Sequence, residues 1–68
     1  MATIKVPEYV RNTVKSIPAE KRAQAIKFAT AEFYNYLERL DAFDDFGREV
    51  NIAMAWEAVH AELQHQFL

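Results

Sequence analysis

Two Glu-x-x-His segments are the residues whose types and spacing could support chemistry in this chain. Glu57 pairs with His60, and Glu62 pairs with His65. In di-iron helical bundles two helices each supply such a pair, and two further helices each supply a glutamate. Here both pairs fall in one predicted helix, where histidines five residues apart point about 140° apart. The pairs cannot share a site within one chain, so we predict no metal ion and no other cofactor.

Other site chemistries have little support. Asp41, Asp44 and Asp45 form a carboxylate cluster without the alternating ligands and central glycine of a calcium loop, and helix capping explains them better. Ser16 is the only serine and has no histidine near it in sequence, and the chain has no cysteine. A 68-residue domain also has little room for an enclosed pocket of about 300 Å³ or more. We therefore predict that the protein is not an enzyme.

The positions of Pro7, Pro18 and Gly47 predict the elements that would hold these residues. Proline suits the first turn of a helix, and glycine lowers helix propensity. We expect helices over about 7–16, 18–41 and 45–66, after a short N-terminal arm. The predicted fold is a single all-α domain over residues 1–68, with two long antiparallel helices completed by a partner chain or a second copy.

The middle helix has one apolar stripe and two aromatic residues outside it. Within an arc of about 80° lie Ile26, Ala29, Phe33, Leu37 and Leu40, which we predict to face the core. Phe28 points to roughly the opposite side, and Tyr34 also lies off the stripe. Because aromatic side chains are favoured anchors in protein interfaces, we predict that Phe28 and Tyr34 contact a partner.

The last helix is apolar on two opposite sides. The stronger stripe consists of Ile52, Trp56, Val59, Leu63 and Phe67; the other side carries Phe46, Val50, Ala53, Met54, Ala58 and Ala61. A helix of this kind is normally buried on both sides, and the first helix, with Val10, Val14 and Ile17 on one face, is too short to cover the second. We therefore predict that Val50, Met54, Ala58 and Ala61 bind another chain. The alternative is a compact monomer in which the first helix fills the groove.

Charge and hydropathy narrow the class of protein. Residues 1–30 carry six basic and two acidic side chains, whereas residues 31–68 carry two basic and eight acidic ones. This asymmetry indicates two surfaces of opposite charge. No run approaches the roughly 18 apolar residues of a membrane span, and the start lacks the pattern of a signal peptide. We expect a soluble cytoplasmic protein that does not bind membranes.

The segment Thr3-Ile4-Lys5-Val6-Pro7-Glu8, with the helical pattern that follows it, resembles the opening of ribbon-helix-helix repressors, including many antitoxins. The resemblance implies that residues 3–6 form a strand that pairs with a second chain and reads DNA. Thr3 and Lys5 would point to the bases, and Arg11 in the basic front half would contact phosphate. The chain departs from the family where Ile17-Pro18 stands in place of a glycine-containing turn. The alternative is that residues 1–6 are an extended arm.

Two functions of different classes follow from these patterns. The first is a small helical module that regulates or inhibits a protein partner by binding it and that also self-associates as a dimer or larger homo-oligomer. Accessory proteins of phages and mobile elements have this profile, by analogy of fold alone. The second is a dimeric DNA-binding repressor or antitoxin.

Overall fold

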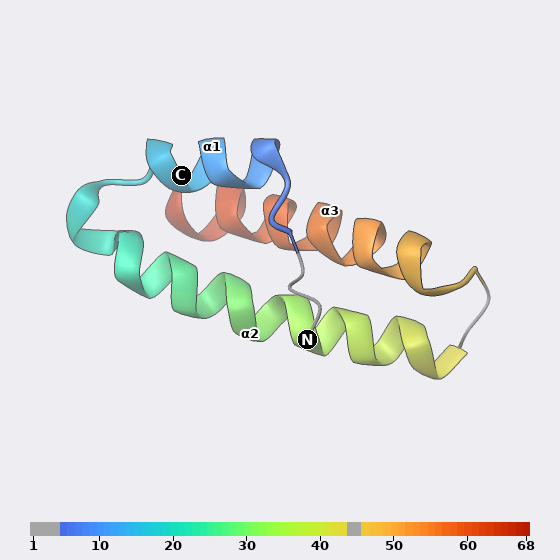
Figure 1. The fold of residues 1–68 in the computed structure, drawn as a ribbon. Helices are drawn as coiled ribbons and strands as arrows, with labels where there is room; N and C mark the ends of the chain where they lie inside the picture. Colours follow the sequence, from blue (N-terminus) through green and yellow to red (C-terminus); the bar gives the residue numbers. More distant parts are fainter. Residues whose placement is uncertain (1–4, 44–45) are drawn as a thin grey trace.

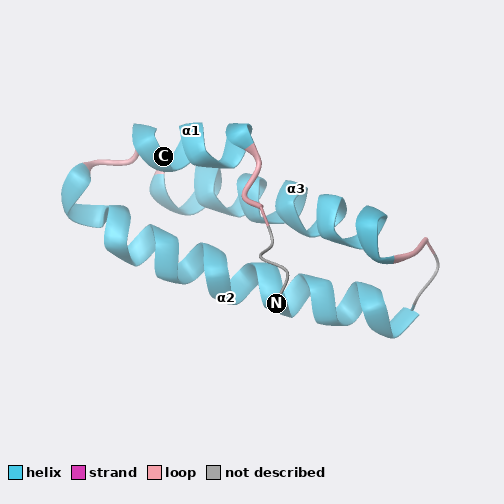
Figure 2. Ribbon diagram, in the orientation of Figure 1, coloured by secondary structure: helices cyan, strands magenta, loops and turns pink. Residues whose placement is uncertain are grey.

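Three α-helices make up the fold in the computed structural model, which describes residues 5–43 and 46–68. The helices are α1 (Glu8–Ser16), α2 (Ala19–Phe43) and α3 (Arg48–Phe67), and the described residues contain no strand. The long helices α2 and α3 run antiparallel, and α1 lies along the half of the pair where α2 begins and α3 ends (Figure 1). Figure 2 shows that only short connections separate the helices. The prediction of an all-α fold is confirmed.

Proline and arginine define the ends of α1. Pro7 occupies the N-cap, and its carbonyl accepts hydrogen bonds from the N–H groups of Val10 and Arg11. The helix ends at Ser16, and the C-cap residue Ile17 has an extended backbone and a fully buried side chain. The Arg22 side chain of α2 reaches back and donates to the carbonyls of Ile17 and Lys15 at 3.0 and 2.9 Å. The turn between α1 and α2 is therefore held by the core on one side and by a guanidinium on the other.

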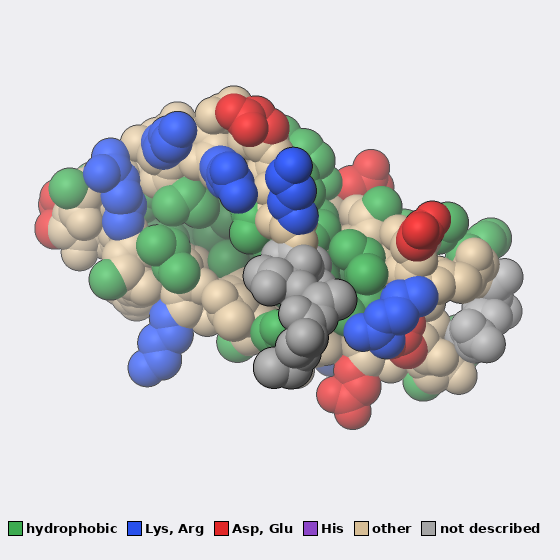
Figure 3. All heavy atoms as spheres, in the orientation of Figure 1, with side chains coloured by type: hydrophobic (Ala, Val, Ile, Leu, Met, Phe, Trp, Pro, Cys, Tyr) green, Lys and Arg blue, Asp and Glu red, His purple; other side chains and the backbone are tan. Residues whose placement is uncertain are grey.

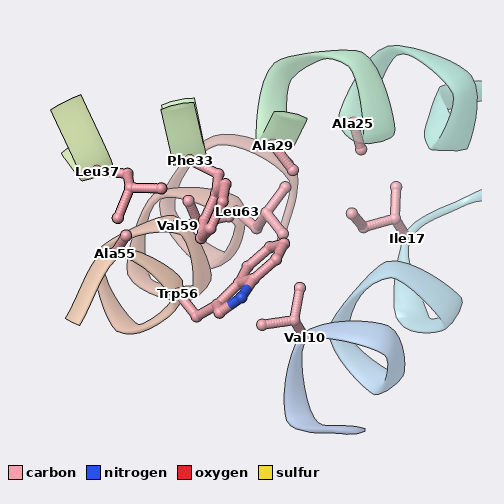
Figure 4. Close-up of a cluster of buried hydrophobic side chains, with 10 residues drawn as sticks. All are labelled: Val10, Ile17, Ala25, Ala29, Phe33, Leu37, Ala55, Trp56, Val59 and Leu63. Carbon is pink, nitrogen blue, oxygen red and sulfur yellow. The ribbon is translucent and has the colours of Figure 1, made fainter. Parts of the chain in front are cut away.

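The core lies between all three helices (Figure 4). It consists of Val10, Ile17, Ala25, Ala29, Phe33, Leu37, Ala55, Trp56, Val59 and Leu63. Phe33 of α2 and Trp56 of α3 stack with ring centroids 4.1 Å apart and planes inclined by 24°. Ala25 and Ala55 are completely buried, so small residues allow the helix backbones to approach each other closely.

Two predictions for α2 are wrong. Ile26 was expected in the core, but its side chain is 53% exposed, and Ala25 takes the buried position. Phe28 was expected on the side opposite the core, but it is half-buried and packs edge-on against Phe67, with ring centroids 5.7 Å apart. The two errors have different causes. The buried arc of α2 extends to Ala25 and is wider than the predicted stripe, which brings Phe28 against α3. Ile26 lies within that arc but lines a hollow between α1 and α2.

The start of α3 also differs from the prediction. Gly47 lies at the N-cap with φ of 94°, not in the first turn, and this is a backbone conformation that residues with a Cβ rarely adopt. The expected capping residues Asp44 and Asp45 lie outside the described residues. Asp41, near the end of α2, accepts hydrogen bonds from Asn51 at 2.9 Å and Arg48 at 2.8 Å. These bonds tie the end of α2 to the first turn of α3.

Candidate functional site

An apolar groove between α1 and α2 has a volume of about 400 Å³. We call it the α1/α2 groove. Its lining residues are Val6, Val10, Arg11, Val14, Lys15, Ile26, Ala29, Thr30 and Trp56. A smaller hollow of about 150 Å³, lined partly by Phe33 and Tyr34, shares Val6, Thr30 and Trp56 with it.

The rim of the α1/α2 groove is basic. Arg11 and Lys15 lie one helical turn apart on α1, both are exposed, and the lining residues include no carboxylate. Figure 3 shows Lys and Arg side chains along α1 above a strip of hydrophobic side chains that continues between α1 and α2. The groove therefore offers an apolar floor and a cationic edge to whatever enters it.

Trp56 lies at the floor of the groove. Its side chain is 8% exposed, and its Nε1–H has no hydrogen-bond acceptor among the described residues. The edge of the indole that carries the nitrogen faces Val10 of α1 (Figure 4). A buried donor without an acceptor costs about 1–3 kcal/mol. The packing of the aromatic ring offsets this cost.

A second apolar surface runs along the side of α3 turned away from Val59 and Leu63. We call it the outer face of α3; it consists of Val50, Ala53, Met54, Glu57, Ala58 and Ala61, together with Phe46 just before the helix. Phe46 is 65% exposed, Val50 44% and Met54 38%. Ala53 and Ala61 are exposed, and Ala58 is half-buried. The second apolar side that the sequence predicted on this helix is therefore uncovered in the single chain.

One edge of the outer face of α3 meets α1. The rings of Tyr9 and His60 pack edge-on with centroids 5.0 Å apart. Partial burial raises the pKa of the Tyr9 phenol above its ordinary value of 10.0, and the negative charge of Glu57 raises it further. Glu57 is therefore close enough to α1 to act electrostatically on it, and it is the only carboxylate on the outer face of α3.

The structure separates the residues that the sequence grouped as partner contacts. Val50, Met54, Ala58 and Ala61 share the outer face of α3. Tyr34 is 57% exposed and lines the smaller hollow, where its ring packs edge-on against Phe33. Phe28 packs within the chain. That these residues contact a partner stays a prediction.

The α1/α2 groove was missed in the sequence, although a signal for it exists. Val6, Val10 and Val14 repeat every four residues, and Ile26 belongs to the apolar stripe of the middle helix. These positions indicate apolar side chains that face each other across two helices. The sequence could not show that the packing of the three helices leaves a hollow between these side chains.

The residues expected to read DNA lie in different surroundings. Thr3 is outside the described residues, and Lys5 is exposed in a segment without strand structure. Arg11 lies on the rim of the α1/α2 groove.

Among residues 5–43 and 46–68, no three side chains of the metal-ligating types gather at one point. The same residues contain no helix of the length and apolar character that crossing a bilayer requires.

Comparison with known proteins gives no family assignment. No protein-family model, curated protein or solved structure matches this chain. The function therefore has to be argued from the two apolar surfaces alone.

Proposed function

We propose that this chain is a non-enzymatic protein-interaction module, which regulates or inhibits a partner protein by binding it and which also associates with itself. The observation that carries the proposal is the exposure of Phe46, Val50 and Met54 on the outer face of α3. Full burial of each such side chain is worth on the order of 1.5–3 kcal/mol. Contiguous apolar patches on small proteins commonly mark interaction sites.

The side chains on this face suit the approach of another helix. Alanines at positions 53, 58 and 61 leave the α3 backbone accessible, while Val50 and Met54 project from it as larger anchors. Methionine adapts its shape to an irregular partner surface because its side chain is unbranched and flexible. The fold prediction included completion of the helical bundle by another chain. We propose that this chain packs on the outer face of α3.

Affinity capture with a charge placed on the outer face of α3 tests this function. Wild-type protein, Met54→Glu and the control Gln66→Glu would each be immobilised and exposed to extract of the source cells. Gln66 is exposed on α3 but lies well away from the outer face, so the control adds the same charge elsewhere. We expect a partner that wild type and Gln66→Glu retain and Met54→Glu loses, with the purified pair then forming a complex in calorimetry.

Two results would contradict the proposal. If Met54→Glu retains the same proteins as wild type, the outer face of α3 is not the binding surface. If instead the protein is retained on DNA at moderate salt and Lys5→Ala abolishes that retention, the DNA-binding function replaces this one.

A further inference from the structure

We propose that the α1/α2 groove of one copy receives the outer face of α3 of a second copy, so that chains join head to tail. The inference rests on the proposed function and names which surfaces meet when the chain self-associates. Its starting point is that one chain presents two apolar surfaces on different helices. The groove opens between α1 and α2, and the exposed residues of the outer face of α3 are not among its lining residues.

The two surfaces have complementary shapes. The α1/α2 groove is concave, with Val10 and Val14 on one wall and Ile26 on the other. The outer face of α3 is a convex helical surface on which Val50 and Met54 project. An amphipathic helix laid into a hydrophobic groove is a recurring mode of recognition, in which residues about one turn apart act as anchors. Val50 and Met54 have that spacing.

The two surfaces also have complementary charge. The groove rim carries Arg11 and Lys15 and no carboxylate. On α3, Glu49, Glu57 and Glu62 outnumber the single cation, Arg48, and Arg48 is already paired with Asp41 at 2.8 Å. Glu57 lies on the outer face itself. The carboxylate of the outer face, Glu57, therefore has two cations available at the groove rim of the next copy.

A symmetric pairing of two outer faces is less favourable. It would place the Glu57 carboxylates of both copies in one interface, where like charges repel. It would also leave the apolar floor of the α1/α2 groove exposed in each copy. The head-to-tail arrangement separates the Glu57 carboxylates and covers both surfaces. Because such an interface is heterologous, it produces open chains or closed rings rather than two-fold dimers.

Complementation between two defective variants tests this arrangement. Ile26→Glu places a charge on the groove wall, and Met54→Glu places one on the outer face of α3; both positions are exposed, so both variants should fold. Ala31→Glu and Gln66→Glu are controls at exposed positions on the same two helices. Sedimentation velocity would follow the mass of each protein over micromolar to millimolar concentration, with circular dichroism confirming helical content.

We expect wild type and both controls to form species that grow beyond dimers with concentration. Ile26→Glu alone and Met54→Glu alone should stay monomeric, with association weakened at least about tenfold. Their equimolar mixture should form a heterodimer and nothing larger, because each variant keeps the one surface that the other lacks.

Three results would overturn the inference. In the first, Met54→Glu is monomeric while Ile26→Glu still dimerises, as a symmetric α3 interface requires. In the second, the two monomeric variants fail to combine when mixed. In the third, wild type stays monomeric throughout. The first two results leave the proposed function intact, and the third removes only its self-association. Binding of a partner protein is tested separately by the capture experiment with Met54→Glu, so the two failures are distinguishable.

Discussion

Trp56 links the core to the α1/α2 groove at a single residue. Its indole stacks on Phe33, faces Val10 and forms part of the groove floor. Burial of the apolar ring is favourable, whereas burial of an Nε1–H without an acceptor opposes it. The two contributions can be separated by substitutions that remove the donor and the ring in turn.

We predict that Trp56→Phe lowers the free energy of unfolding by less than about 1.5 kcal/mol, because phenylalanine can keep the stack on Phe33 and removes the unpaired donor. Trp56→Ala should cost about 3–5 kcal/mol, the usual range for deleting a large aromatic side chain from a core. Urea denaturation followed by circular dichroism measures both values. If the two substitutions cost the same, the indole N–H has an acceptor in solution.

Asn51 is a buried polar residue that, unlike Trp56, has a hydrogen-bond partner. Asn51 is almost completely buried, and its amide donates to Asp41. A buried amide needs such a partner, because without it the amide would lose its hydrogen bonds to water. The sequence placed Asn51 on neither apolar stripe of the last helix. Its burial depends on Asp41, ten positions earlier, which only the folded turn brings within reach.

At the scale of elements, the short helix α1 depends on its connection to α2. Nine residues are too few for a stable isolated helix. Its position is fixed by Val10 and Ile17 in the core and by Arg22, which donates to two carbonyls at its C-terminal end. A cation at that end also interacts favourably with the helix dipole.

We predict that Arg22→Ala lowers the free energy of unfolding by about 1 kcal/mol, the usual net value of such hydrogen bonds at a partly exposed site. Arg22→Lys should recover at most half of the loss, because an ammonium lacks the planar fork that reaches two carbonyls together. Lys21→Ala, an exposed neighbour, should stay within about 0.5 kcal/mol of wild type. Equal stabilities in urea for Arg22→Ala and Lys21→Ala would show that the guanidinium does not hold the turn.

Helix type and approximate length followed from the sequence because proline positions and 3.6-residue periodicity act locally. The wrong predictions concern residues whose environment depends on other parts of the fold. Ile26 and Phe28 were misplaced because the buried arc of α2 depends on which helices pack against it. Gly47 was misplaced because its positive φ belongs to a turn and not to a helix. The outer face of α3 could be predicted from one helix, whereas the α1/α2 groove exists only between two.

For the whole molecule, the segregation of charge along the chain becomes a segregation of charge in space. The basic residues of the first half include Arg11 and Lys15 on the groove rim, and the acidic second half includes Glu57 on the outer face of α3. Charges that flank an apolar contact contribute more to orientation and association rate than to affinity. The proposed head-to-tail contact should therefore combine a salt-insensitive apolar part with a salt-sensitive polar part.

We predict that self-association weakens several-fold between about 0.1 M and 1 M sodium chloride, over which the screening length falls from about 10 Å to about 3 Å. Replacing both Arg11 and Lys15 with glutamine should weaken association at low salt and flatten its salt dependence. Lys21→Gln removes an exposed cation outside the groove and should leave the salt dependence of association unchanged. Sedimentation equilibrium across the salt series measures the dissociation constants. The dissociation constant of wild type could instead depend on salt as weakly as that of the double variant. The groove rim would then not recognise acidic side chains, and apolar contacts such as those of Met54 and Ile26 alone would hold the copies together.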